Sequence, residues 1–174
     1  MGAEKPEVML SAKEIDERIK EMAEQISKDY EGKKPLLIGV LKGAVIFLSD
    51  LIRHLSIPLE IDFMAVSSYG ADTASSGVVR IQMDLEQSIK DKDVLIVEDI
   101  VDTGLTLNYL YENLSSRKPR SLKVVTLLDK PDRRKVQFVP DYCGFTIPDR
   151  FVIGFGLDFN ENYRYLADLC VLDE

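Results

Sequence analysis

Hydrophobic positions along the chain recur with two different periods, and the change from one period to the other divides the sequence into helices and strands. Over residues 12–30 the apolar side chains are spaced three or four positions apart, and Ser11 with Glu14 matches a capping box at the start of that stretch. The pattern therefore predicts an amphipathic helix over 12–30. Two further helices are predicted over 44–55 and 105–114.

Short apolar runs lie between these helices. Residues 36–41 and 94–97 carry no charged or polar side chain, which is typical of strands buried on both faces of a parallel sheet. Further strands are predicted over 59–66, 78–85 and 122–128. Because strands alternate with helices, the sequence predicts an α/β fold: a twisted, mainly parallel sheet flanked by helices on both faces. Ligands bind such sheets at the carboxyl ends of the strands.

Two segments fall outside this alternation. From Tyr142 onward, short strand-like pieces over 152–155 and 169–172 lie among prolines and glycines, and we expect the two ends of the chain to form a small C-terminal/N-terminal hood over the sheet edge. Residues 67–77 are rich in Ser, Gly and Ala, so this segment is expected to be mobile or ordered by a ligand. No repeat or linker divides the chain, and a single domain over 1–174 is predicted.

Composition limits the classes of function. The chain has 174 residues, 45% of them hydrophobic and 30% charged, as in an ordinary globular domain. Its net charge of −8 argues against a protein that coats nucleic acid. Cys143 and Cys170 have no CxxC spacing or histidine cluster beside them, so reduced, buried thiols are expected. With no signal peptide and no apolar run near the length of a membrane span, a cytoplasmic enzyme without a membrane partner is expected.

Candidate chemistry is concentrated in residues 94–107. The apolar strand runs into Glu98, Asp99 and Asp102, three carboxylates whose mutual repulsion Mg²⁺ or sugar hydroxyls could offset. The loop from Asp102 to Thr106 then offers backbone N–H groups, two hydroxyls and the positive end of a helix dipole, which suits a phosphate. Taken alone, Thr103 could equally be an ordinary helix cap.

Residues 98–104, Glu-Asp-Ile-Val-Asp-Thr-Gly, resemble the phosphoribosyl pyrophosphate signature of type I phosphoribosyltransferases. Four further segments narrow the resemblance: Leu-Lys-Gly-Ala at 41–44, Ser-Ser-Tyr-Gly at 67–70, Leu-Asp-Lys-Pro at 128–131, and 147–154 continuing to Asp158. Together they are similar to the short bacterial hypoxanthine (hypoxanthine-guanine) phosphoribosyltransferases, and the likeness extends from Ser11 to Glu174.

This resemblance implies a Mg²⁺-dependent purine salvage enzyme. It would transfer 5-phosphoribosyl from phosphoribosyl pyrophosphate to hypoxanthine or guanine, giving IMP or GMP and pyrophosphate. On the donor side it implies ribose and Mg²⁺ binding by Glu98 and Asp99, general base or acid chemistry by Asp102, and a 5′-phosphate cradle made of Thr103, Gly104, Leu105 and Thr106.

The same resemblance implies the remaining site residues. For the purine these are Lys130 as donor to the six-oxo group, Phe151 as stacking partner and Val152 as a backbone contact. For pyrophosphate they are the loop of Leu41, Lys42 and Gly43, with its cis peptide, together with Asp158 on a second Mg²⁺ and Arg164. Ser68 and Tyr69 would open a segment that closes over the site. Ala44 departs from the family's usual glycine, which leaves the conformation of the loop in question.

Several alternatives stay open at this point. Without the surrounding motifs, Lys130 is better interpreted as a solvated cation and Phe151 as a core aromatic. A nucleotide-responsive regulator that binds RNA or DNA, or an enzyme acting on xanthine, uracil or orotate, are rival functions. The preference between hypoxanthine and guanine is undetermined, and family members are usually homodimers or homotetramers.

Overall fold

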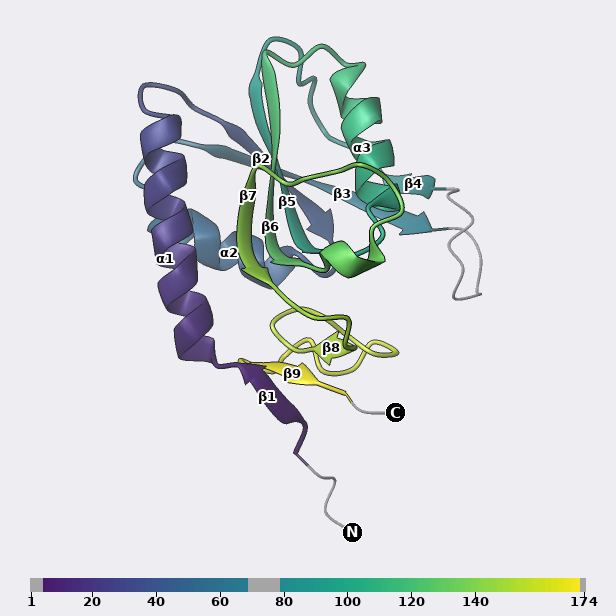
Figure 1. Ribbon diagram of the computed structural model, residues 1–174. Helices are drawn as coiled ribbons and strands as arrows, with labels where there is room; N and C mark the ends of the chain where they lie inside the picture. The colour runs from purple at the N-terminus through teal and green to yellow at the C-terminus, as the bar shows by residue number, and fades with distance from the viewer. Residues whose placement is uncertain (1–4, 69–78, 173–174) are drawn as a thin grey trace.

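The computed structural model describes residues 5–68 and 79–172, and a six-stranded sheet runs through its centre (Figure 1). The strand order is β4-β3-β2-β5-β6-β7. All neighbouring pairs are parallel except β3 and β4, which confirms the mainly parallel sheet. The strands are β2 (Leu36–Leu41), β3 (Glu60–Ser68), β4 (Val79–Met83), β5 (Asp93–Val101), β6 (Ser121–Asp129) and β7 (Tyr142–Thr146).

Helices cover both faces of the sheet, as the alternation of elements predicts. The helices α1 (Ala12–Asp29) and α2 (Val45–His54) pack on one face, and α3 (Leu105–Ser115) packs on the other (Figure 1). Successive residues of β5 serve the two faces in turn: Leu95 contacts the α1 and α2 side, whereas Ile96 contacts the α3 side. A strand buried on both faces must be apolar throughout, which explains the uninterrupted run at 94–97.

The boundaries follow local chemistry. The capping box is present, with Ser11 Oγ accepting from the Glu14 N–H at 3.1 Å and Glu14 Oε2 accepting from the Ser11 N–H at 2.7 Å. The strand β5 is longer than predicted and continues through the acidic residues to Val101. Its pairing with β6 continues beyond the apolar run, with Glu98 opposite Thr126. Hydrophobicity alone therefore marks only the buried part of this strand.

A second, three-stranded sheet forms the hood. Its order is β1 (Glu7–Leu10), β9 (Leu169–Val171) and β8 (Val152–Ile153), all antiparallel. The hood lies beyond the carboxyl ends of β5 and β6 rather than over the sheet edge, so that part of the expectation is wrong (Figure 1). The edge is instead filled by β7, which pairs with β6 although its segment was expected to belong to the hood.

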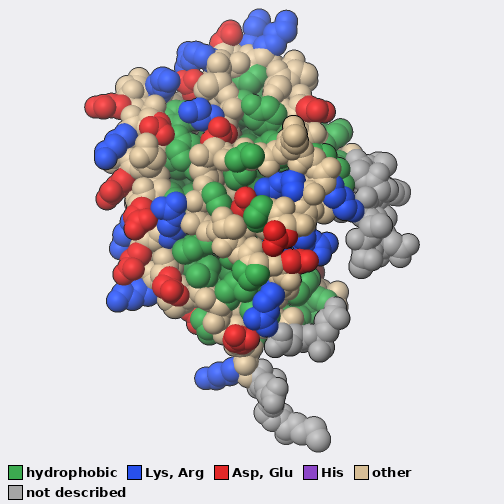
Figure 2. Space-filling model, viewed as in Figure 1, with side chains coloured by type: hydrophobic (Ala, Val, Ile, Leu, Met, Phe, Trp, Pro, Cys, Tyr) green, Lys and Arg blue, Asp and Glu red, His purple; other side chains and the backbone are tan. Residues whose placement is uncertain are grey.

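The surface and the thiols agree with an ordinary globular protein. On the face shown in Figure 2, Lys and Arg side chains are interspersed with Asp and Glu. Cys170 is a buried free thiol and Cys143 a half-buried one, so the expectation of two fully buried thiols holds only for Cys170. Within 5–68 and 79–172, no helix has both the length and the apolar character needed to cross a membrane.

The amino end of β5 depends on a buried carboxylate. The side chain of Asp93 is 2% exposed and accepts hydrogen bonds from Arg120 Nη2 at 2.8 Å and Ser121 Oγ at 2.7 Å. The hydrogen bond from Arg120 is the main reason that the pKa of Asp93 lies below its ordinary value. A carboxyl whose pKa is lowered by folding stabilises the folded state above its unfolded pKa.

We predict that Asp93→Asn lowers the free energy of unfolding by about 1–3 kcal/mol at pH 7, because a charged hydrogen bond is lost. Urea unfolding measures this difference. It should be complete above about pH 3.9, the unperturbed pKa of aspartate, and disappear as the pH falls through the lowered folded pKa. The exposed Asp132→Asn is the control, and equal effects of both variants would contradict the prediction.

Candidate active site

The candidate site lies where β5 ends and the hood begins. Glu98 and Asp99 are strand residues of β5, and Asp102 is the first residue after it. Glu98 is 8% exposed and Asp99 is half-buried. The prediction that the three carboxylates lie at the carboxyl end of the central strand is confirmed. Glu98 and Asp99 belong to the strand itself, however, and not to the loop that follows it.

The ionised forms of Glu98 and Asp99 are disfavoured by burial and by the closeness of the two side chains. Burial raises the pKa of Glu98 well above its ordinary value, and the neighbouring charge of Asp99 raises it further. Burial also raises the pKa of Asp99, although the Ile100 N–H and the charge of Arg164 act in the opposite direction. A nearby cation would favour the ionised form of both side chains.

This donor set fits a magnesium ion that is only partly held by protein. Among the described residues, no group of three or more His, Cys, Asp or Glu side chains is arranged to enclose a metal. Mg²⁺ usually keeps several waters and binds through one or two carboxylates together with substrate oxygens. Glu98 and Asp99 therefore fit an ion whose remaining ligands come from the substrate and water.

The loop after β5 has the form of an anion cradle. Gly104 has φ +82°, in the left-handed region, and α3 begins at the next residue. Thr103 Oγ1 accepts from the Leu105 N–H at 3.3 Å, but Gly104 is the residue that precedes the helix, so Thr103 is not its N-cap. A pocket opens here, lined by Glu98, Ile100, Val101, Asp102, Thr103, Gly104, Thr106 and Leu107. We call it the cradle pocket.

A second pocket lies beside the first and reaches the hood. Its lining consists of Asp99, Ile100, Asp102, Lys130, Phe151, Val152, Leu157 and Asp158. We call it the ring pocket. Lys130 is 6% exposed, so it is not the solvated cation of the alternative interpretation. Phe151 is 48% exposed and meets Phe159 edge to face at 5.7 Å, so it is not a core aromatic.

Asp102 has a partner that sequence reasoning missed. Arg133, in the short 3-10 helix Pro131–Arg133, places Nε 2.6 Å from Asp102 Oδ1. Its Nη1 lies 3.4 Å from Asp149 Oδ1. The charge of Asp102 is the main cause of a raised pKa of Arg133, and the charge of Asp149 adds to it. Nothing in the sequence separates this arginine from the other cations around it.

The loop after β2 approaches the carboxylates through its backbone. The peptide bond between Leu41 and Lys42 is cis, as the resemblance implies. A side chain at Gly43 would collide with the Asp99 carboxylate. Ala44 has φ −82° and ψ −2°, an ordinary right-handed conformation, so alanine in place of the usual glycine is accommodated without strain.

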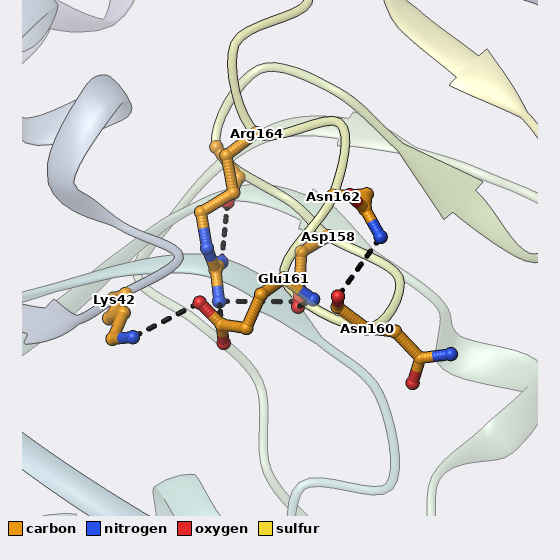
Figure 3. A network of polar contacts seen from close by, with 7 residues as sticks. Lys42, Asp158, Asn160, Glu161, Asn162 and Arg164 are labelled. Carbon is orange, nitrogen blue, oxygen red and sulfur yellow. Dashed lines mark hydrogen bonds and ion pairs between the residues drawn. The ribbon is translucent and has the colours of Figure 1, made fainter.

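The hood closes on this loop through a polar network (Figure 3). A Cβ atom at Gly156 would lie 2.5 Å from the carbonyl oxygen of Gly43, so the two backbones touch. Arg164 donates through Nη1 to the Gly156 carbonyl at 2.8 Å, and its Nη2 lies 3.4 Å from Asp158 Oδ1. The network also contains Glu161, which no motif in the sequence singles out. Of the two residues expected to open the closing segment, Ser68 ends β3, and Tyr69 lies outside the described residues.

The comparisons with known proteins agree with this geometry. The sequence profile of the phosphoribosyl transferase domain matches residues 10–160. Together with the strand carboxylates and the anion cradle, it defines the chain as a phosphoribosyltransferase.

Closer relatives identify the branch. The hypoxanthine-guanine phosphoribosyltransferase of Lactococcus lactis is 54% identical over 165 residues, which cover 95% of this chain and 90% of that protein. That of Bacillus subtilis is 51% identical over 165 residues, covering 95% and 92%. The crystal structure of a Staphylococcus aureus hypoxanthine phosphoribosyltransferase superposes with a TM-score of 0.93 at 50% identity, covering 96% of this chain and 91% of that one. The chain belongs to the hypoxanthine-guanine phosphoribosyltransferases, and the resemblance seen in its motifs is confirmed.

Gly43 offers a direct test of the contact with Asp99. We predict that Gly43→Ala displaces the carboxylate and lowers kcat/KM for phosphoribosyl transfer by about 100-fold, a loss that a misplacement of about 1 Å is enough to cause. Circular dichroism should show the fold retained. The control is Gly32→Ala, in the turn after α1, where a Cβ would meet nothing within 4 Å. Its φ of +76° makes alanine strained there, so this variant can lose stability but should keep its activity while folded. Full activity of both variants would contradict the prediction.

Proposed function

We propose that this protein transfers 5-phosphoribosyl from phosphoribosyl pyrophosphate to hypoxanthine or guanine, with Asp102 as the group that handles the proton on the base. The observation that carries the proposal is the place of Asp102, which lines both the cradle pocket and the ring pocket. A ribose whose phosphate is bound in the cradle pocket would present its C1′ toward a base in the ring pocket. The bond to be formed would then lie beside Asp102.

The donor would be held by backbone and carboxylates. The N–H groups of residues 103–106 and the start of α3 suit its 5′-phosphate. Glu98 and Asp99 would bind the ribose hydroxyls and Mg²⁺, with Asp158 placed for a second ion at the pyrophosphate. Bound Mg²⁺ would neutralise charge that develops on the leaving pyrophosphate.

The acceptor would be selected by one buried cation. An ammonium donates hydrogen bonds and accepts none, so Lys130 favours the six-oxo group of hypoxanthine and guanine over the amino group of adenine. Burial strengthens that preference, because a buried ammonium without an acceptor is costly. Phe151 is exposed enough to stack on a ring, and Val152 would contact the ring edge through its backbone.

In the transfer step, an imidazole nitrogen of the purine forms a bond to C1′ as the bond from C1′ to the pyrophosphate oxygen breaks. The pyrophosphate leaves with the electron pair, and Asp102 accepts the proton of the purine N–H. Arg164 and the loop of Leu41, Lys42 and Gly43 would hold the leaving group. Arg133 must release Asp102 for the base to approach.

We also propose that the chain is a single catalytic domain and that it assembles as a homodimer or homotetramer. The pairing of β1 with β9 supports the first part, because it joins the two ends of the described chain in one sheet. Light scattering of the purified protein distinguishes the two assemblies from a monomer.

Asp102→Asn tests the assigned base. The amide cannot take up the proton, so we predict that kcat falls by about 10²–10⁴-fold while the fold and IMP binding are kept. The matched control is Asp149→Asn, which removes the other carboxylate beside Arg133 but lies outside both pockets. Undiminished turnover by Asp102→Asn would refute the assignment.

A panel of bases tests the acceptor class. At fixed phosphoribosyl pyrophosphate and Mg²⁺, initial rates should be high with hypoxanthine, guanine or both and very low with adenine, uracil and orotate. The rate with xanthine shows how the enzyme recognises the group at the two-position of the purine.

Lys130→Met should lower kcat/KM for the preferred base by about 10- to 100-fold, because a charged hydrogen bond is lost. No pyrophosphate release with any base, together with tight binding of RNA or DNA, would favour the regulator instead.

A further inference from the structure

Glu161 lies between two cations that come from different parts of the chain. Its Oε2 is 3.0 Å from Lys42 Nζ, on the loop after β2, and its Oε1 is 3.2 Å from Arg164 Nη2, in the hood. Figure 3 shows the carboxylate pointing between the two side chains. One oxygen serves each cation, as two oxygens of a bound anion would.

The backbone fixes this carboxylate in place. The Glu161 N–H donates to Asp158 Oδ2 at 2.8 Å, and Asn160 and Glu161 both have positive φ, at +50° and +63°. This local turn directs the side chain toward the loop after β2. The hydrogen bonds from Lys42 and then Arg164 lower the pKa of Glu161, so the side chain is anionic at neutral pH.

The two contacts of Glu161 can be exchanged for others. Lys42 and Glu161 are 67% and 64% exposed, and an exposed ion pair contributes little to stability. Arg164 is only 25% exposed, and its buried Nε has no hydrogen-bond acceptor among the residues that the structure describes. The guanidinium therefore keeps a donor that no protein group within the described chain uses.

We infer that Glu161 is a positioning residue that takes the place of pyrophosphate in the free enzyme. It holds Lys42 and Arg164 together and releases both to the pyrophosphate of the donor, and it reclaims them when pyrophosphate leaves. This inference rests on the proposed function, because the two cations are assigned to pyrophosphate there. A carboxylate in this position competes with the donor and assists release of the product.

The rival interpretation is a permanent clasp, in which Glu161 joins the hood to the loop and supports anion binding. The two interpretations predict opposite signs. Removing a competitor strengthens pyrophosphate binding, whereas removing a clasp weakens it.

Glu161→Gln separates them, because it removes the charge and keeps the shape. Isothermal titration with pyrophosphate and Mg²⁺ should give a Kd about 3- to 10-fold lower than that of the wild type, since the two ion pairs of an exposed carboxylate no longer compete. The KM for phosphoribosyl pyrophosphate should fall by a similar factor, and the KM for hypoxanthine should not change. The gain should shrink as NaCl is raised.

Two further variants complete the experiment. Glu31→Gln removes the same charge in the turn between α1 and β2, at the opposite end of β2 from Lys42, and should leave the Kd for pyrophosphate unchanged. Glu161→Asp keeps the charge on a shorter side chain and should give a Kd between those of Glu161→Gln and the wild type.

Unchanged or weaker pyrophosphate binding by Glu161→Gln overturns the inference. If Glu161→Gln fails to fold, the Kd of Glu161→Asp for pyrophosphate is the test: a value below that of the wild type supports the inference, and an equal or higher value overturns it. Failure of the proposed function has a different signature, because the wild type itself would then form no nucleotide from hypoxanthine. The titration with pyrophosphate would still test the competition in that case.

Discussion

The arrangement of this site follows from one electrostatic constraint: two adjacent carboxylates are built into the buried central strand. Burial raises the pKa values of Glu98 and Asp99, and for Asp99 that effect is opposed by the Ile100 N–H, by a hydrogen bond with Glu98 and by the charge of Arg164. The close approach of Gly43 to Asp99 is possible because glycine has no side chain. The loop after β2 and the hood are both placed to bring backbone and cations to these carboxylates.

A common principle connects the remaining charged residues. Asp102 is paired with Arg133, and Lys42 and Arg164 are paired with Glu161, so these three charges that are assigned to substrates already have partners of opposite sign. Most of these side chains are substantially exposed, and exposed pairs are weak enough to be exchanged. Substrate binding would then replace one ion pair by another rather than leave a charge uncompensated.

The sequence predicted what depends on local pattern and missed what depends on tertiary contact. Its periodicity located the three α-helices of the described residues, the strands of a mainly parallel sheet and the carboxylates at the end of β5, because each of these is encoded within a few neighbouring residues. It expected the amino-terminal segment in the hood but did not predict that β1 is a strand, and it assigned β7 to the hood, because such short strands are defined by their partners rather than by their own composition. Arg133 and Glu161 escaped for the same reason: an exposed charge acquires a specific partner only in the folded chain.

The position of the base site follows from the way in which the chain ends meet. Val152 pairs with Val171 of β9, and the Leu172 N–H donates to the Phe151 carbonyl at 3.0 Å. The strand β9 is held in turn by β1. Phe151 and Val152 are therefore oriented by residues about 20 positions later and by a strand that begins at Glu7. Recognition of the acceptor thus depends on the hood as a whole, whereas the donor cradle is determined by a single strand, loop and helix, which explains why the donor motif is the clearer of the two in the sequence.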